Sequence, residues 1–474
     1  MHVFARVFGC AALAIAALAA PVYGATYYVN ASAADDSGSG SQSAPKKYIS
    51  SGIALMSSSG GDVLTIMPGT YSNTKDSVNS PKAGTASAWN VIKAATDGTV
   101  LITTGLHLGN GNRYVQFEGL KFVDSNQKQI LGGYTKFLRT AFRGGPASGN
   151  SVTVQIGSND FTPGADHILL EDSWVYGLGG RYKILVYNAT NVVLRRVVTR
   201  FDGGYNNTDG APEADITVYD SRDIAVLNAI AIDGITGRGA YVAAFYNALN
   251  GTTGTPNANR EWRGSMTIKP TGYFMGTEGQ SSITNLKVID CASYGGSYGV
   301  SQLKGTNNVY QRLTLVNSGG DGFGIFGGSA TVQDTVVAVP RGEAFNGVSA
   351  SNSLAVSTIN TLIGDGIRYL PRVESGSLLS LGGIQGGQRG ANIMKRLGTS
   401  GTLYGESGYN TETSEDLWPW PYEARIKADF AEESTRGFAG GTATMTDYIF
   451  ALLGNASPIG QVPVPNAPTN VVAD

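Results

Sequence analysis

The sequence is poor in charge, in cysteine and in long apolar runs, and each shortage excludes a class of protein. Charged residues make up 15% of the 474 residues, and 34 basic against 36 acidic side chains leave a formal net charge of −2. This balance gives no electrostatic reason to expect nucleic acid or an acidic membrane surface as a partner. No stretch of the chain approaches the ~18 consecutive apolar residues of a membrane-spanning helix, so we expect no transmembrane segment.

The first 24 residues have the pattern of an export signal. They begin with basic residues, continue with an apolar run from Ala11 to Ala20 and end in small residues. This pattern predicts a signal peptide over residues 1–24 and a bacterial-type protein that is secreted or held at the cell surface. Cys10 would be removed with the signal, so we expect the exported chain to hold Cys291 alone and no internal disulfide.

Glycine is abundant, with 65 residues, but it follows no Gly-X-Y period, which excludes collagen. Instead, a short unit recurs in which two apolar residues flank one variable position, and a second such pair follows. Its recurrence every 22 to 32 residues or so predicts a repeat protein. The second position of each unit falls at Phe117, Leu170, Leu194, Val226, Val288, Val332 and Val356.

A second segment recurs within each period. Lys183–Asn188 aligns with Asp215–Asp220 and with Val242–Asn247, and each alternates between apolar and polar residues. Such alternation predicts short strands, and the Gly, Asn and Asp residues between them predict tight turns. Two or three strands per turn without helices predict a parallel β-solenoid, in which successive turns stack ~4.8 Å apart.

Several single residues have a predicted structural place in this solenoid. Asn191, Asp223 and Asn285 each precede an apolar pair, so we expect left-handed turn residues whose side chains form a hydrogen-bonded ladder. Cys291 occupies the inward slot that Val197 and Ile359 fill in other units, so a buried thiol is expected. Tyr187, Tyr219 and Tyr246 are expected to stack as structural residues.

Helices are expected only at the two ends. The helical spacing within residues 47–57 predicts a small helix that plugs the N-terminal end. Near the other end we expect a helix over Glu423–Ala431 and a second one that Thr446 caps and that continues through Leu453. The predicted organisation is a signal peptide (1–24), a β-helix with its N-terminal cap (25–385), a C-terminal cap region (386–460) and a Pro-rich tail (461–474). The tail is expected to lead toward another module or a surface.

The opening of the chain carries a family resemblance. Tyr27-Tyr28-Val29-Asn30, Gly61-Asp62 and the run Met67–Tyr71 resemble the start of bacterial secreted right-handed parallel β-helix proteins of the pectin-lyase-like superfamily. The resemblance covers roughly Thr26 to Leu370. It implies an all-β fold, a right-handed parallel β-helix with a short N-terminal capping helix and a helical or irregular C-terminal cap. It leaves the activity open, because the superfamily includes polysaccharide lyases, glycoside hydrolases, esterases, tailspikes and adhesins.

Glycoside hydrolysis is the less favoured activity. Asn207–Gly210 resembles the first motif of polygalacturonase-type hydrolases, and Arg425–Lys427 resembles the last. The expected Asp-Asp pair and the Gly-His-Gly element are both missing. We therefore interpret the two matches as coincidence, a polar loop tip and a solvated helix face.

A lyase needs a base, a proton donor and a partner for the uronate carboxylate. Stacking of the repeats predicts that outward residues of successive turns touch, among them Glu171-Asp172, Arg195-Arg196 and Leu227-Asn228, and that Lys183 lies beside Asp215. The predicted catalytic residues are Lys183 or Arg196 as base or carboxylate clamp and Tyr182 as donor. The predicted substrate-binding residues are Arg181, Arg195, Arg200, Asp172, Asn228, Trp174 and Trp262, with long insertions at 203–214 and 248–280 as groove walls. Calcium ligands are expected among Asp202, Asp209, Glu213 and Asp215.

These residues support two functions that the sequence does not separate. In the first, an exported β-helix engages an extended polysaccharide along its outer face and, if it is an enzyme, cleaves a uronate polymer by β-elimination. In the second, the same charges form a solvated salt-bridge ladder on a non-catalytic adhesion or structural protein. Whether the protein is an enzyme is left open.

Overall fold

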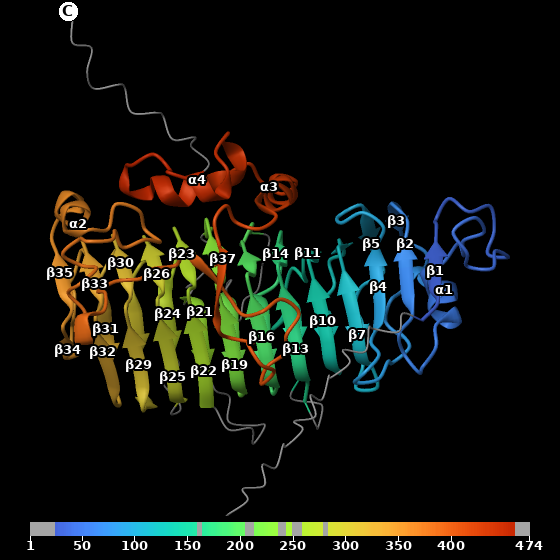
Figure 1. Ribbon diagram of the computed structural model, residues 1–474, viewed down its shortest axis with the longest axis horizontal. Helices are drawn as coiled ribbons and strands as arrows, with labels where there is room; N and C mark the ends of the chain where they lie inside the picture. The colour runs from blue at the N-terminus through green and yellow to red at the C-terminus, as the bar shows by residue number, and fades with distance from the viewer. Residues whose placement is uncertain are drawn as a thin grey trace, which may run out of the picture.

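The chain winds into a right-handed parallel β-helix (Figure 1). The structure is a computed structural model and describes residues 24–158, 164–203, 213–235, 243–248, 258–277 and 283–459. Three parallel sheets run along the helix axis, and each coil in the middle of the described chain contributes one strand to the first, then one to the second, then one to the third, whereas the end coils give no strand to the third. This confirms the fold class that the repeats predict. Within the described residues, no helix is long and apolar enough to cross a membrane.

The first sheet has 14 strands. They are β1 (Thr26–Val29), β2 (Val63–Ile66), β4 (Asn90–Ala94), β7 (Arg113–Glu118), β10 (Gly133–Leu138), β13 (Asp166–Glu171), β16 (Thr190–Arg195), β19 (Arg222–Leu227), β22 (Ala258–Arg263), β25 (Ile283–Ile289), β28 (Gly305–Thr306), β29 (Asn308–Gln311), β32 (Ala330–Gln333) and β34 (Ala350–Ser351).

The second sheet has 12 strands and the third has nine. The second holds β3 (Gly69–Tyr71), β5 (Val100–Ile102), β8 (Leu120–Phe122), β11 (Ala141–Arg143), β14 (Trp174–Tyr176), β17 (Val198–Thr199), β20 (Ile230–Ile232), β23 (Met266–Ile268), β26 (Ala292–Tyr294), β30 (Thr314–Val316), β33 (Val336–Ala338) and β35 (Leu354–Val356). The third holds β6 (His107–Leu108), β9 (Lys128–Ile130), β12 (Val152–Ile156), β15 (Tyr182–Tyr187), β18 (Ala214–Tyr219), β21 (Ala243–Ala248), β24 (Tyr273–Thr277), β27 (Val300–Gln302) and β31 (Phe323–Phe326).

The remaining elements lie at the ends and on the flank of the β-helix. Four are α-helices, namely α1 (Ile49–Leu55), α2 (Ile359–Asp365), α3 (Glu423–Ala431) and α4 (Met445–Phe450). Four are short 3-10 turns, η1 (Thr74–Asp76), η2 (Ile384–Gly386), η3 (Gly437–Gly440) and η4 (Ala451–Leu453). A two-stranded antiparallel hairpin pairs β36 (Lys395–Leu397) with β37 (Glu412–Asp416).

The register of the first sheet confirms the repeat. Leu170 pairs with Leu194, which pairs with Val226, as their spacing predicts. The long steps between predicted markers are indeed two coils each, with Phe137, Trp262 and Tyr310 in the intervening coils. These inward side chains are fully buried and form the core of the solenoid.

Two repeat assignments are wrong. Val356 belongs to β35 of the second sheet, and Ile359 begins α2, so the last predicted unit is not a further coil. In the third sheet Thr217 pairs with Tyr246 and Tyr219 pairs with Ala248, so the Val242–Asn247 alignment is displaced by two residues. Tyrosines 187 and 219 still meet edge to face, 5.6 Å apart. The displacement arises because loops of variable length precede the strands of the third sheet.

The corner residues behave as the sequence predicts. Asn191, Asp223 and Asn285 all have positive φ. The Asn285 amide donates to Asn259, the Asn259 amide donates to the Asp223 carboxylate, and the Asn191 amide donates to Asp166. The buried thiol of Cys291 takes its inward slot, and its burial raises the pKa of the thiol to about 12. Cys291 therefore packs in the core as a small apolar side chain would, and this position requires no reactive thiol.

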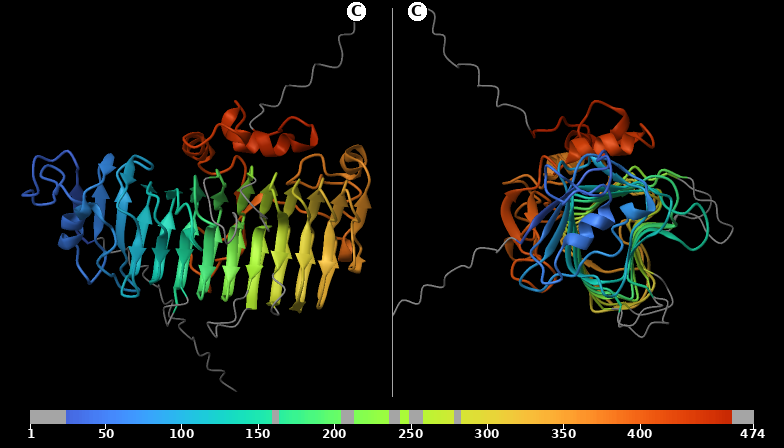
Figure 2. Two further views of the ribbon diagram at one scale, coloured as in Figure 1. Left: turned by 180° about the vertical axis from the view of Figure 1, so that it is seen from behind. Right: turned by 90° about the vertical axis from the view of Figure 1, so that its right-hand side faces the viewer.

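The chain ends carry the predicted helices. Ile49, Ile53 and Met56 of the α1 region are buried at the N-terminal end, and α3 has the predicted bounds. Thr444 rather than Thr446 caps α4, because the Thr444 hydroxyl accepts from the amide of Asp447. The structure adds where the C-terminal region lies. After α2 the chain turns back, and residues 393–459 run along the flank of the β-helix (Figures 1 and 2).

Candidate functional site

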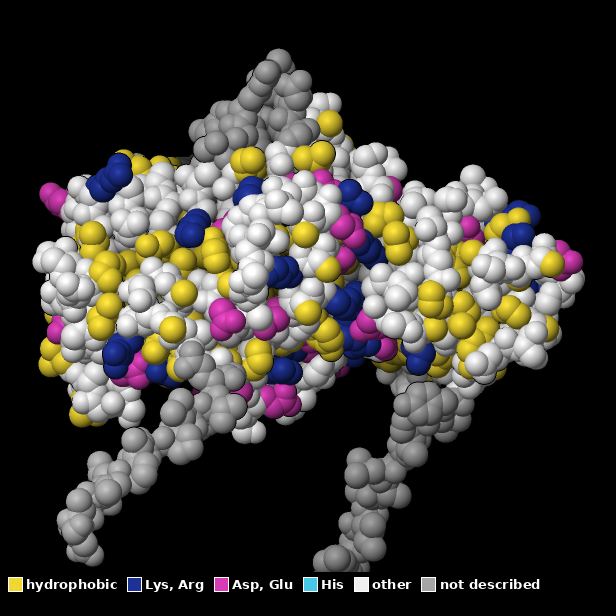
Figure 3. Space-filling model, turned by 90° about the horizontal axis from the view of Figure 1, so that it is seen from above, with side chains coloured by type: hydrophobic (Ala, Val, Ile, Leu, Met, Phe, Trp, Pro, Cys, Tyr) yellow, Lys and Arg dark blue, Asp and Glu magenta, His cyan; other side chains and the backbone are white. Residues whose placement is uncertain are grey.

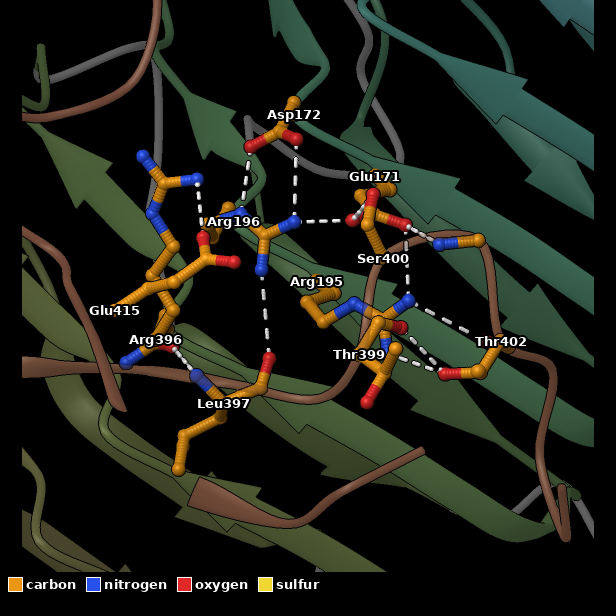
Figure 4. Close-up of polar contacts among 12 residues, drawn as sticks. Glu171, Asp172, Arg195, Arg196, Arg396, Leu397, Thr399, Ser400, Thr402 and Glu415 are labelled. Carbon is orange, nitrogen blue, oxygen red and sulfur yellow. Dashed lines mark hydrogen bonds and ion pairs between the residues drawn. The ribbon is translucent and has the colours of Figure 1, made fainter. Parts of the chain in front are cut away.

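The predicted charge ladder forms on the outer face of the first sheet. Glu171 of β13 pairs in register with Arg195 of β16, and the Arg195 Nη2 atom lies 2.8 Å from Glu171 Oε2. Arg196 binds Asp172 through Nε at 2.6 Å and Nη2 at 3.1 Å, and it also binds Glu171 (Figure 4). Residues 24 apart in the chain therefore touch, as the stacking of coils predicts.

The ladder is covered by the hairpin Lys395–Asp416, which we call the arm. The Ser400 hydroxyl and the Gly401 amide each donate to Glu171 at 2.7 Å. The Leu397 amide donates to Asn228 Oδ1 at 2.7 Å, and Arg195 Nη1 donates to the Tyr409 carbonyl at 2.9 Å (Figure 4 shows the first part of the arm). The arm is thus fastened to the predicted substrate-binding residues themselves.

The prediction of an open groove at these residues is wrong. The side chains of Arg195, Arg196 and Glu171 are 0%, 2% and 1% exposed. Burial raises the pKa of Glu171, but the two arginines outweigh burial and hold that pKa below its ordinary value. The carboxylate stays ionised, and its hydrogen-bonding capacity is used by the arginines and the arm.

The other predicted catalytic residues are also inaccessible. The Lys183 ammonium donates to the carbonyls of Gly177 and Gly179 at 2.7 Å each, and its burial lowers the pKa of Lys183 to about 8. The Tyr182 hydroxyl donates to Glu213 at 3.2 Å, and the residue is 5% exposed. Neither side chain reaches a surface at which a polymer could lie, so their catalytic roles remain predictions without support from the geometry.

The predicted aromatic contacts are packing residues. Trp174 lies under α3, where its indole N–H donates to Asp429 at 2.7 Å. Trp262 points into the solenoid, packs 4.8 Å from the ring of Phe245 and is fully buried. Its assignment to an insertion is wrong because β22, β23 and β24 of residues 248–280 make a complete coil. Arg200 is likewise buried and donates to the Phe430 carbonyl.

Two of the four carboxylates expected to bind calcium pair with arginines. Asp202 lies 2.7 Å from Arg200, and Glu213 pairs with Arg181. Asp215 is buried beside Lys183, and Asp209 lies outside the described residues. Across the ranges that the structure describes, no three His, Cys, Asp or Glu side chains gather as a metal site would require. Asp202 and Glu213 are thus held by arginines, and the calcium site stays a prediction.

An uncovered stretch follows on the same face of the first sheet. One column of outward residues runs along this sheet. It is buried at Leu169, Val193 and Ala225, but the next two residues in it, Glu261 and Lys287, are partly and fully exposed. A cavity of about 490 Å³ opens there, and a second of about 360 Å³ lies beside it over the next outward column. We call the outer face of β22, β25 and β29, with the arm residues and residues 384–392 that border the two cavities, the trough.

The trough is lined by carboxamides, tyrosine hydroxyls and charged side chains. The ladder of Asn259, Asn285 and Asn307 forms one side of the larger cavity. The arm supplies the opposite side through Tyr404 and Tyr409, whose ring centroids lie 4.6 Å apart. The smaller cavity adds Gln311, Gln388 and Asn392. Such groups both donate and accept hydrogen bonds.

Three charged residues line the larger cavity, namely Glu261, Lys287 and the buried Arg260, and the smaller cavity is lined by five more, Arg263, Asp290, Arg312, Asp334 and Glu412. Glu261 accepts a hydrogen bond from Asn410 of the arm at 2.9 Å. Lys287 is exposed, and among the described residues it makes no ion pair or hydrogen bond. The side of the molecule that carries α3 and α4 shows basic and acidic side chains next to each other rather than a patch of one sign (Figure 3). The lining of the trough also carries both signs, so a ligand there meets hydrogen-bonding groups and charges together.

Sequence reasoning found the ladder but missed the trough. Tyr404, Tyr409 and Asn410 lie beyond the repeats, so no period marks them as neighbours of β22. Lys287 and Glu261 carried a usable signal, because the register that predicts Arg195 beside Glu171 also places these two on the same outward face. The ladder stood out only because its charges are denser.

The comparisons with known proteins bear on the fold alone. No family model matches the chain, and no curated protein matches it. Among solved structures, the pectate lyase Pel9A is 14% identical over 76% of this chain and 92% of its own, with a TM-score of 0.46. The structure of XylC with xylose is 8% identical over 62% and 69%, with a TM-score of 0.47. An alginate lyase from Paenibacillus sp. str. FPU-7 is 13% identical over 57% and 94%, with a TM-score of 0.37.

Proposed function

We propose that this protein binds an extended polysaccharide along the trough. The observation that carries the proposal is a pair of polar cavities on one face, about 490 and 360 Å³, lined by carboxamides and charged side chains, with two tyrosines bordering the larger one. Sugar hydroxyls act as donors and acceptors at once, which suits Asn and Gln side chains. Aromatic rings offer apolar surface to the C–H faces of sugars.

The shape of the fold favours a polymer over a small molecule. The first sheet repeats every ~4.8 Å along its axis, which is close to the length of one sugar unit. A glycan that lies parallel to the axis meets equivalent positions of β22, β25 and β29 in turn. Ligand sites for single small molecules are usually more enclosed than this open face.

Binding is the function that the geometry supports best, and β-elimination of a uronate polymer is its finer alternative. The residues predicted for elimination are buried, so the proposal does not depend on them. Export of the protein remains part of the proposal through the predicted signal over residues 1–24, and so does attachment through the tail. Residues 1–23 and 460–474 lie outside the described residues.

Affinity electrophoresis tests the proposal. The purified protein is run through gels that contain polygalacturonate, alginate, xylan or a β-glucan, and we expect at least one polymer to retard it. Lys287→Ala should weaken that retardation, whereas Lys304→Ala, an equal change of charge at an exposed lysine outside both cavities, should not.

Absence of retardation by every polymer, or equal effects of the two lysine variants, contradicts the proposal. The same samples are followed by ultraviolet absorbance, because β-elimination leaves an unsaturated, absorbing product. A rise in absorbance with a polymer that binds would favour the lyase; a flat trace would favour binding alone.

A further inference from the structure

We infer that the buried network of Glu171 and Arg195 positions the trough wall, and so sets the affinity for glycan without touching it. The inference rests on the proposed function. It concerns the loop at residues 398–411 of the arm, which carries Tyr404 and Tyr409. Glu171 and Arg195 are positioning residues in this scheme, because both are fully buried under that loop.

The loop is a preformed unit. The Gly398 amide donates to the Thr411 carbonyl at 2.7 Å, and the Thr399 amide donates to the Gly408 carbonyl at 3.0 Å. The Leu403 amide is bound by the Glu406 carboxylate at 2.7 Å. These bonds fix the shape of the loop but not its height or tilt above the first sheet.

Polar contacts with the β-helix set height and tilt. On the second limb Asn410 donates to Glu261 at 2.9 Å and accepts from Arg263 at 3.4 Å, but Arg195 is the one group that binds both limbs. Arg195 donates to both limbs of the loop, to the Thr402 hydroxyl and carbonyl at 3.3 Å each and to the Tyr409 carbonyl at 2.9 Å. Glu171 accepts from Ser400 and from the amide of Gly401 on the first limb, at 2.7 Å each. Arg195 and Glu171 are bound to each other, so both limbs share one rigid support.

A separate apolar contact holds the loop on the sheet. Leu403 is 3% exposed and packs with Leu169, Val193 and Ala225. Loss of a polar tether should therefore leave the loop attached but less fixed. If the loop becomes ordered only when glycan binds, the affinity falls, because ordering the loop costs free energy during binding.

The experiment compares two serines of the same loop. Ser400→Ala removes a donor to Glu171, which keeps Arg195 and Arg196, so the urea midpoint should move little. Ser407→Ala is the matched control, because Ser407 is exposed and binds nothing among the described residues. Affinity is measured by electrophoresis in the gel polymer that retards the wild type.

We expect Ser400→Ala to weaken glycan affinity at least about fivefold, in the range of coupling between sites. Ser400→Thr, which keeps the hydroxyl, should restore it, and Ser407→Ala should match the wild type. Wild-type affinity for Ser400→Ala, or an equal loss in Ser407→Ala, overturns the inference. Tyr409→Ala separates the two proposals, because wild-type affinity in that variant contradicts the trough itself.

Discussion

Two ion pairs occupy the same corner of the β-helix and differ in what lies above them. Asp172 and Arg196 are joined at 2.6 and 3.1 Å, and Asp290 and Arg312 at 2.8 and 2.7 Å. All four residues have φ between 51° and 53°. The Arg196 side chain is 2% exposed under the arm, whereas the Arg312 side chain is 27% exposed.

The repeat therefore sets the geometry of each ion pair, and cover by the arm determines how much that pair contributes to the free energy of unfolding. In the exposed pair, water can replace each partner, so little free energy depends on the pair. In the covered pair, Arg196 also binds Glu171 and the Leu397 carbonyl, and no water takes their place if one partner is removed. The same kind of ion pair is accessible to solvent in one coil and holds the arm in place in another.

The largest expected effect is the loss of the covered guanidinium. Arg196→Ala should lower the free energy of unfolding by about 3–5 kcal/mol, because it removes a buried partner from the carboxylates of Glu171 and Asp172. Urea denaturation followed by circular dichroism measures the change. A loss below about 1 kcal/mol would mean that the arm does not exclude water from the Arg196 ion pair.

The next effect concerns the amide side chain that holds the first strand of the arm. Asn228→Ala should cost about 1–3 kcal/mol, because the Leu397 amide is left buried without its acceptor. The same denaturation assay measures it, with Asn285→Ala as the control from the exposed ladder. Equal losses in the two variants would contradict the distinction between covered and open corners.

The smallest expected effect is in the open pair itself. Arg312→Ala should lower the free energy of unfolding by no more than about 1 kcal/mol. The comparison with Arg196→Ala under one buffer isolates the contribution of the cover. If Arg312→Ala lowers the free energy of unfolding as much as Arg196→Ala does, the stabilisation comes from the corner geometry and not from cover by the arm.

Much of the fold was predictable because its rules are local. The alternation of apolar residues and the left-handed corner residues recur within each coil, so Leu170, Leu194 and Val226 could be aligned without a structure. The approach fails where the recurrence ends. Val356 looks like another marker although it belongs to a different sheet, because a three-residue apolar pattern does not identify its sheet.

The site was predictable only as far as the coil geometry reaches. The contact of Arg195 with Glu171 follows from the repeat, but the contact of Ser400 with Glu171 joins residues 229 apart and follows from no period. Tyr409 therefore could not be placed beside Asn285 from the sequence. The burial of the ladder depends on several such long-range contacts of the arm, with Glu171, Arg195 and Asn228.

Hydrogen–deuterium exchange of Glu171→Gln against the wild type tests the central claim, that the covered ladder fastens the arm. The account predicts faster exchange of the amides in residues 397–411, above all Gly401, whose amide is bound by Glu171. The amides of β13 and β16, which lie in the parallel sheet, should keep their protection. Unchanged exchange across residues 397–411 would contradict the account.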